Sequence, residues 1–145
     1  MKLTKKLRDL LNENEKGLEG GITSRKVGKM TVFTFHNKNG DDVGMVRGFE
    51  LQNKKVLLLD QVSKGSDFDS GPEHFMTKAY RMLLKEYPII ISDKVQTPKA
   101  AKIWDTLMKG EMSNKIIKTV DMNKKARYVI MKTLDNSYKI DFDLP

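Results

Sequence analysis

Polar residues lie between a predicted buried strand and a predicted helix. Residues 89–91 are three consecutive isoleucines, a pattern typical of a strand covered on both faces. The segment that follows carries Ser92, Asp93, Gln96 and Thr97. Open α/β folds bind ligands at the carboxyl ends of their strands, so these side chains are the first site candidates. Asp93 or Gln96 is expected to contact a ligand or substrate, with turn formation as the alternative role of Asp93.

Thr97 also has a structural explanation, because threonine is a good helix N-cap and Pro98 suits the first helical position. A helix is therefore predicted to begin there and to end near Gly110. We interpret its tryptophan first as a core residue. Its predicted buried face consists of Ala100, Trp104, Leu107 and Met108, and its predicted solvent face of Lys99, Lys102 and Asp105.

Composition excludes several kinds of site. A chain of 145 residues fits one domain, predicted over residues 1–145. It has no cysteine and only two histidines, His36 and His74, which excludes disulfides and thiolate metal sites and argues against structural zinc. No apolar run reaches about eighteen residues, and the N-terminus lacks a cleavage-site pattern. We therefore expect a cytoplasmic protein with no metal site, membrane span or signal peptide.

The net charge of +8 suggests a nucleic-acid partner, because a basic surface attracts phosphate. The lysines are scattered along the chain, however, which favours solubility as their role. The sequence shows neither aromatic-basic interleaving nor a helix-turn-helix pattern, so a nucleic-acid-binding module ranks last. Any such contacts are expected at the densest basic clusters, which are Lys2, Lys5, Lys6 and Arg8, and Lys124, Lys125 and Arg127.

Periodicity and turn signals predict the order of the elements that position these residues. In chain order these are an amphipathic helix over 3–11, a loop to residue 20, strands over 30–36, 43–51 and 56–62, a loop over 63–71, a helix opening at Pro72, the strand 89–91, the helix after Thr97, strands over 116–120 and 128–134, and an acidic tail over 137–145.

The first three predicted strands are joined by short turns, one of them at Asn39-Gly40, and should form an antiparallel meander. The third and fourth strands are joined by a helical crossover and must be parallel. The predicted fold class is therefore α/β, with a mixed, mostly antiparallel sheet and a central parallel pair flanked by helices.

This order of elements resembles the GNAT fold of N-acetyltransferases. Residues 89–107, IIISDKVQTPKAAKIWDTL, are similar to the strand, SD..QT and W..L pattern of small GNAT-like proteins of bacteriophages. The pattern covers roughly residues 56–109, and the order of elements covers nearly the whole chain.

The resemblance implies that acetyl-CoA is the cofactor, held where the two parallel strands splay apart, here residues 57–62 and 89–92. The pantetheine arm would pair with the backbone of the first strand, and the pyrophosphate would rest on amides at the start of the next helix. The implied cofactor contacts are Leu59, Val62, Ser70, Gly71, His74, Gln96, Thr97 and Trp104.

The loop before that helix departs from the family pattern. Family members carry a Q/R-x-x-G-x-G/A loop whose glycines let the backbone approach phosphate, whereas DSGPEHFMTKAY retains only Gly71. Asp67, Asp69 and Glu73 make the loop acidic, and acidic side chains repel a pyrophosphate. A self-capped surface turn is therefore the alternative interpretation of this loop.

Acyl transfer of the kind implied needs a base for the amine and often an acid for the leaving thiolate. Asp60, near the end of an apolar strand, is expected to be partly buried with a raised pKa, with a structural hydrogen bond as the alternative. Tyr80 or Tyr87 could be the acid, although both also suit the core. The candidate catalytic residues are Asp60, Glu50 and Asp93.

Two functions follow from the resemblance. The first is a phage-type, acyl-CoA-dependent N-acyltransferase acting in the host cytoplasm on an amine of a protein, small molecule or nucleobase. The second is a catalytically inactive GNAT fold that serves as a virion or host-interaction protein.

Overall fold

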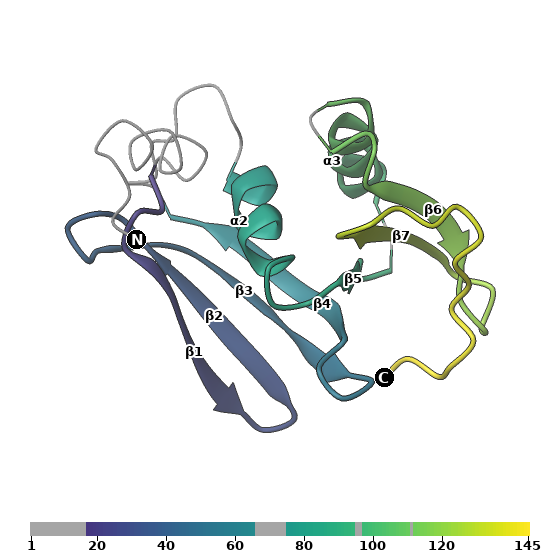
Figure 1. Cartoon of the computed structure of the whole chain (residues 1–145), viewed down its shortest axis with the longest axis horizontal. Coiled ribbons are helices and arrows are strands. Elements are labelled where there is room, and N and C mark those ends of the chain that lie inside the picture. Colours follow the sequence, from purple (N-terminus) through teal and green to yellow (C-terminus); the bar gives the residue numbers. More distant parts are fainter. Residues whose placement is uncertain (1–16, 66–74, 95–96, 111) are drawn as a thin grey trace, which may run out of the picture.

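The computed structural model describes residues 17–65, 75–94, 97–110 and 112–145. Seven strands form one sheet in the order β1-β2-β3-β4-β5-β7-β6, accompanied by helices α2 and α3 (Figure 1). Within the described residues, neither helix is long and apolar enough to cross a membrane. The elements are β1 (Gly21–Val27), β2 (Met30–His36), β3 (Asp42–Leu51), β4 (Val56–Lys64), α2 (Phe75–Leu83), β5 (Ile89–Ile91), α3 (Pro98–Lys109), β6 (Ile116–Val120) and β7 (Ala126–Met131).

Strands β1 to β4 form an antiparallel meander joined by short turns. Gly28 and Gly40 adopt φ values of 64° and 85° in the first two turns, where a side chain would be strained. The turn predicted at Asn39-Gly40 is therefore present. The third turn contains three consecutive residues with positive φ, Gln52, Asn53 and Lys54.

Strand β1 was not among the predicted elements, so the meander has four strands instead of three. Its sequence, GITSRKV, has only one large apolar residue before its last position, and most of its side chains are exposed. An edge strand pairs on one side only and needs little apolar surface, which explains why hydrophobic periodicity did not indicate it. The predicted N-terminal helix over 3–11 lies outside the described residues.

The predicted parallel pair is confirmed. Strand β4 pairs with β5 in parallel through the crossover that contains α2, and β5 pairs with β7 antiparallel. The fold class is thus α/β with a mixed, mostly antiparallel sheet, as predicted. The start of α2 predicted at Pro72 falls outside the described residues.

Both helices cover the same face of the sheet. Their buried side chains and one face of strands β2 to β5 and β7 form a continuous apolar core. Its aromatic and large aliphatic members include Phe33, Phe35, Leu57, Tyr80, Leu83, Ile90 and Trp104.

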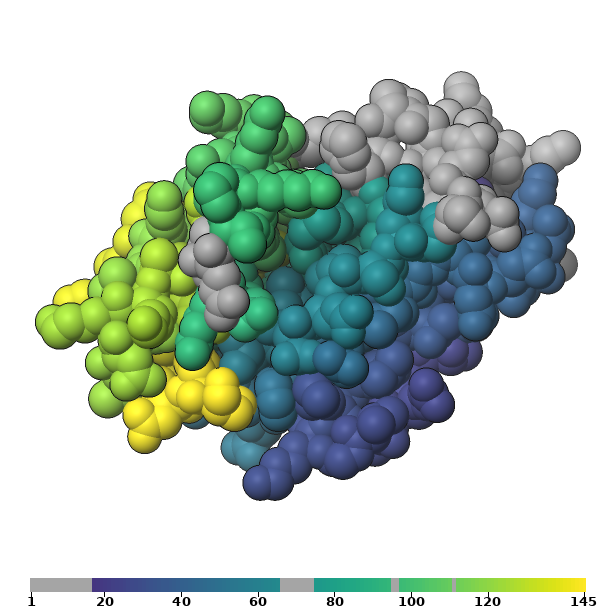
Figure 2. Space-filling model, turned by 180° about the vertical axis from the view of Figure 1, so that it is seen from behind, coloured from purple at the N-terminus to yellow at the C-terminus, as the bar shows by residue number. Residues whose placement is uncertain are grey.

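The opposite face of the sheet is packed against the end of the chain. Ile140 is buried in a second apolar cluster with Val56, Leu58, Ile91 and Val129. Three further residues of this segment, Tyr138, Phe142 and Leu144, also pack against the cluster. The charged residues that alternate with them are exposed. Figure 2 shows these yellow C-terminal residues at the surface next to the teal strands. The segment predicted as an acidic tail over 137–145 therefore covers part of the core.

Candidate functional site

The sheet opens where β4 and β5 stop pairing. The last parallel pair is Leu58 with Ile91, although β4 continues to Lys64. Figure 1 shows β5 as a short strand beside the much longer β4. In the described part of the chain, residues 59–64 therefore have no strand partner on their β5 side. The backbone polar groups of these residues that do not bond to β3 face an opening.

A bulge in β4 lies at the start of this opening. Arg47 pairs with Gln61 and Gly48 pairs with Leu59, so Asp60 is an extra residue in β4. A Cβ atom on Gly48 would lie 2.4 Å from the carbonyl oxygen of Leu58, so this close approach requires glycine. A bulge bends its strand and often ends regular pairing, which explains why β4 leaves β5 at this point.

A cavity of about 560 Å³ adjoins the open part of β4. Its wall on one side is the end of β4 and the start of α2, and on the other side the exposed face of α3. Its polar groups are three lysines and one threonine, and no carboxylate or imidazole is among its described lining residues. The cavity therefore suits an anionic ligand with an apolar portion. It is lined by Val62, Lys64, Phe75, Met76, Lys99, Lys102, Ile103, Thr106 and Leu107.

The Phe75 ring, which forms the aromatic wall of the cavity, packs against Gly44 of β3. A Cβ atom on Gly44 would lie 2.4 Å from the Phe75 ring, so the ring lies directly on the backbone of β3. Phe35 packs edge-on against Phe75, with ring centroids 5.4 Å apart. These two contacts fix the direction in which Phe75 lines the cavity.

Helix α3 begins as the sequence predicts. Thr97 is its N-cap, with Oγ1 accepting a hydrogen bond from the Ala100 amide at 3.1 Å, and Pro98 is its first residue. Lys99, Lys102, Ile103 and Thr106 recur at helical spacing beside the buried face. Both lysines are exposed, as the sequence predicts, and both also line the cavity. The i, i+3, i+4, i+7 spacing of this second stripe was the signal that could have indicated a second contact face.

Three stacked rings connect the two helices with the sheet. Trp104 lies between Tyr80 of α2 and Tyr128 of β7, with ring centroids 5.5 and 5.3 Å away and planes within 9° of parallel. The Tyr128 hydroxyl donates a hydrogen bond to Asp105 at 2.9 Å. The Tyr80 hydroxyl is fully buried and has no hydrogen-bond partner among the described residues, and burial raises the pKa of Tyr80 above its ordinary value. Trp104 is thus a core residue, as its first interpretation predicts.

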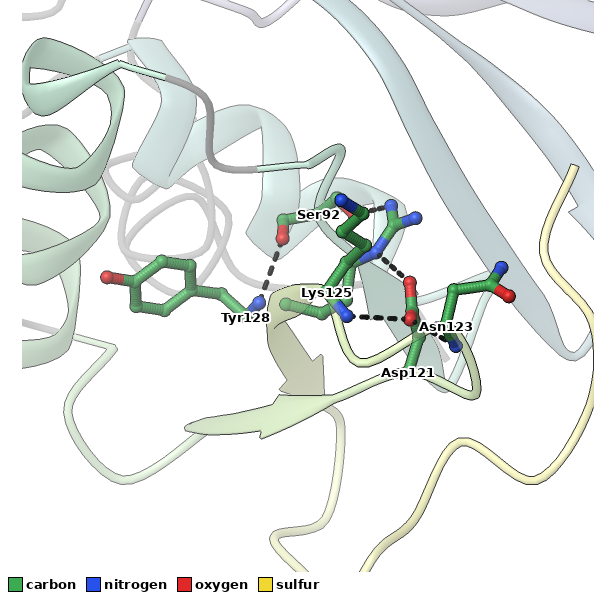
Figure 3. Close-up of polar contacts among 6 residues, drawn as sticks. Ser92, Asp121, Asn123, Lys125 and Tyr128 are labelled. Carbon is green, nitrogen blue, oxygen red and sulfur yellow. Dashed lines mark hydrogen bonds and ion pairs between the residues drawn. The ribbon is translucent and has the colours of Figure 1, made fainter.

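Ser92 is tied into a buried polar network (Figure 3). Its hydroxyl oxygen accepts a hydrogen bond from the Tyr128 amide at 2.8 Å, and its carbonyl accepts one from Arg127 Nη1 at 3.0 Å. Arg127 also pairs with Asp121 at 2.9 Å. Burial opposes ionisation of Asp121, but hydrogen bonds from the Lys125 amide, Arg127 and the Asn123 amide outweigh it and hold the pKa of Asp121 below its usual value. This network accounts for Ser92 structurally.

The predicted catalytic carboxylates do not meet in the cavity. Asp60 is half-buried and forms an ion pair with Arg47 at 2.6 Å, which corresponds to the structural alternative. Asp93 is exposed and follows β5 where the sheet opens. Glu50 lies beside Leu57, near the start of β4, and accepts hydrogen bonds from the side chains of Lys26, Thr31 and Tyr87.

The predicted cofactor contacts are only partly in the described structure. Val62 lines the cavity, and Leu59 is buried in the core on the same strand. Thr97 caps α3 and Trp104 is buried behind it. The remaining predicted contacts, Ser70, Gly71, His74 and Gln96, lie outside the described residues.

Comparisons with known proteins return structures only, since no family model and no curated protein matches the chain. A mutant of the spermidine N-acetyltransferase SpeG from Vibrio cholerae is 13% identical with a TM-score of 0.46, over 87% of this chain and 72% of that chain. A GNAT-family acetyltransferase from Staphylococcus aureus is 11% identical with a TM-score of 0.43, over 90% of this chain and 81% of that chain. At these identities and scores the likenesses carry no argument about activity or ligand.

Proposed function

We propose that the chain is a phage-type, GNAT-like N-acyltransferase that binds an acyl-CoA in the cavity between β4, α2 and α3 and acylates an amine. The observation that carries this proposal is the part of β4 beyond Leu58, which has no strand partner on its β5 side in the described structure and contributes Val62 and Lys64 to an apolar, basic cavity.

The open edge of β4 suits the pantetheine arm. Backbone N–H and C=O groups need partners, and an extended ligand that carries amides can pair with such an edge as an added strand would. The apolar lining from Phe75, Ile103 and Leu107 suits the hydrocarbon parts of the same arm. Both features border the same cavity, which supports a ligand that is amide-bearing and partly apolar.

The lysines of the cavity suit the phosphates. Lys64 comes from β4, whereas Lys99 and Lys102 come from α3, so the positive charge arises on both sides of the cavity. Lysine binds phosphate as a compact point charge and does not require a glycine-rich loop. The missing Q/R-x-x-G-x-G/A motif therefore does not argue against acyl-CoA at this site.

The transfer forms a C–N bond at the amine and breaks the thioester C–S bond, and one proton passes from the amine to the departing thiolate. A bound acyl-CoA supplies the activated acyl group. Of the predicted carboxylates, we propose Asp93 as the base, because it follows β5 at the opening. Asp60 is held by Arg47 and Glu50 by Lys26, so both carboxylates already have cationic partners.

One observation favours the second candidate function, an inactive GNAT fold that binds the ligand without transferring its acyl group. No carboxylate or imidazole is among the described residues that line the cavity. Such a protein would serve as a virion or host-interaction protein. Binding and turnover must therefore be measured separately.

Calorimetric titration with acetyl-CoA tests the binding step at an ionic strength of about 0.15 M, which screens loose attraction between the basic chain and the anion. Saturable one-to-one binding is expected, and Lys102→Gln should weaken it by roughly fivefold. Lys109→Gln is the matched control, because Lys109 is on the same helix but does not line the cavity. Absence of binding, or equal losses in both variants, would sink the proposal.

Thiol release from acetyl-CoA in the presence of a panel of amines then tests the transfer step. The proposed enzyme should release thiol with at least one amine, and Asp93→Asn should reduce the rate without a comparable loss of acetyl-CoA affinity. Binding without thiol release for any amine would support the second candidate instead.

A further inference from the structure

A second cavity, of about 690 Å³, lies at the opposite end of α2. It is bordered by β1, β2, the end of β3, the β3–β4 turn and the segment after α2. We propose that this cavity binds a small molecule that combines a phosphate-like anion with an apolar or aromatic group. The proposal goes beyond the acyl-CoA site and does not depend on it.

The carboxylate inside this cavity is already satisfied. The Glu50 side chain is only 9% exposed. It accepts hydrogen bonds from Lys26 Nζ at 2.5 Å, Thr31 Oγ1 at 2.7 Å and Tyr87 Oη at 2.8 Å. Burial opposes its charge, but these donors lower the pKa of Glu50 to about 2. Glu50 is thus a fixed anion whose charge Lys26 balances, and it leaves little capacity for a cationic ligand.

The remaining charges of the cavity favour an anion. Arg25, Lys54 and Lys85 line it together with one further carboxylate, Glu86. Within the described residues, Arg25 and Lys54 form no ion pair. An ammonium ligand would meet this excess of positive charge and be repelled, whereas a dianion would be attracted.

The turn that presents Lys54 has an unusual backbone. Gln52, Asn53 and Lys54 have φ values of 54°, 57° and 66°. Residues other than glycine and asparagine rarely adopt φ values in this left-handed region. Backbone strain of this kind concentrates at functional sites. Positive φ is also typical of tight β-hairpin turns, and here it fixes the turn that carries Lys54 at the edge of the cavity.

The floor of the cavity is apolar and ordered by aromatic packing. Phe33 and Tyr87 pack edge to face, with ring centroids 5.7 Å apart, while the Tyr87 hydroxyl is held by Glu50. Ile22, Met82 and Leu83 complete the apolar lining. An aromatic or aliphatic group would bury apolar surface here while its anion remains near Lys54.

Phenyl phosphate is a suitable probe, and amide chemical shifts of the isotopically labelled protein report where it binds. At an ionic strength of about 0.15 M, saturable shifts are expected in β1, in the β3–β4 turn and after α2. Lys54→Gln should weaken binding by roughly fivefold. Lys55→Gln is the matched control, because Lys55 is exposed in the same turn but does not line the cavity; it should change the affinity by less than about twofold.

The outcomes separate clearly. Three results would overturn the proposal: shifts that do not saturate, shifts centred on the cavity between β4, α2 and α3 (the α3 cavity), or equal losses of affinity in Lys54→Gln and Lys55→Gln. Inorganic phosphate and phenol test the two parts of the ligand. Both should bind more weakly than phenyl phosphate. If inorganic phosphate binds as tightly, the apolar group contributes nothing, and if phenol binds as tightly, the anion contributes nothing; either result would overturn that part of the proposal.

Discussion

Arg127 and Asp121 form an ion pair that is almost completely buried, with Nε and Oδ2 2.9 Å apart and side-chain exposures of 3% and 2%. Because Arg127 also donates to the Ser92 carbonyl, the pair ties the β6–β7 turn to the end of β5. The contact lies in the network that positions Tyr128, and through it the ring stack behind α3.

Removing one partner of this pair should destabilise the fold strongly. Asp121→Ala leaves the Arg127 guanidinium buried and uncompensated, so the free energy of unfolding should fall by about 3 kcal/mol. Urea denaturation measures it. The half-exposed pair of Arg47 and Asp60 supplies the comparison, because Asp60→Asn should cost at most about 1 kcal/mol. Similar losses in the two variants would show that burial of the first pair has no special effect.

The contribution of Glu50 to stability should depend on pH below about 4.5. Its folded pKa is lowered from 4.5 to about 2, so its stabilising effect is complete above the unfolded value and is lost as the pH falls towards 2. The difference in unfolding free energy between the unchanged chain and Glu50→Gln should therefore shrink on acidification through this range. A difference that stays constant as the pH falls from about 6 to about 3 would contradict this.

The hydroxyl of Tyr80 should cost stability. It is buried and has no hydrogen-bond partner in the part of the chain that the structure describes, and an unsatisfied buried hydroxyl is unfavourable. Tyr80→Phe should therefore raise the free energy of unfolding by about 1 kcal/mol. Tyr128→Phe should lower it by a similar amount, about 1 kcal/mol, because it removes a hydrogen bond to Asp105. If Tyr80→Phe instead destabilises the chain, the hydroxyl has a partner such as an ordered water.

The C-terminal segment should stabilise the sheet through its apolar residues. Ile140 is 5% exposed and packs in the second apolar cluster, so Ile140→Ala should cost about 2 to 4 kcal/mol in thermal or urea unfolding. The neighbouring residue Asp141 is exposed, and Asp141→Ala should change stability by less than about 0.5 kcal/mol. Equal, small effects would mean that the segment is not part of the cooperative fold.

Gly44 should control the shape of the α3 cavity. A Cβ atom there would overlap the Phe75 ring, so Gly44→Ala should displace the ring, weaken acetyl-CoA binding and lower stability. Adding Phe75→Leu should restore part of the stability, because a smaller side chain makes room for the methyl group. A Gly44→Ala variant as stable as the unchanged chain would contradict the close packing of these two residues.

Elements with strong local signals were predictable. The isoleucine run of β5, the Thr97-Pro98 start of α3 and the Asn39-Gly40 turn are each specified by neighbouring residues, and the crossover length makes β4 and β5 parallel. Two elements were not predicted. Strand β1 has little apolar periodicity to indicate it, and the alternation of Tyr138, Ile140, Phe142 and Leu144 lies in the segment predicted as an acidic tail.

The sites depended on contacts that neighbouring residues do not specify. Lys64 shares a cavity with Lys99 and Lys102 because β4 and α3 border one opening, although these two elements are far apart along the chain. Glu50 and Asp60 were both candidate bases in the sequence, yet packing placed them with different partners, Lys26 and Arg47. Local sequence thus determined which segments become strands and helices, because capping, turn formation and side-chain periodicity act over a few residues. Tertiary structure alone decided which charges share a cavity and which are buried together, because those contacts join segments that are remote in the chain.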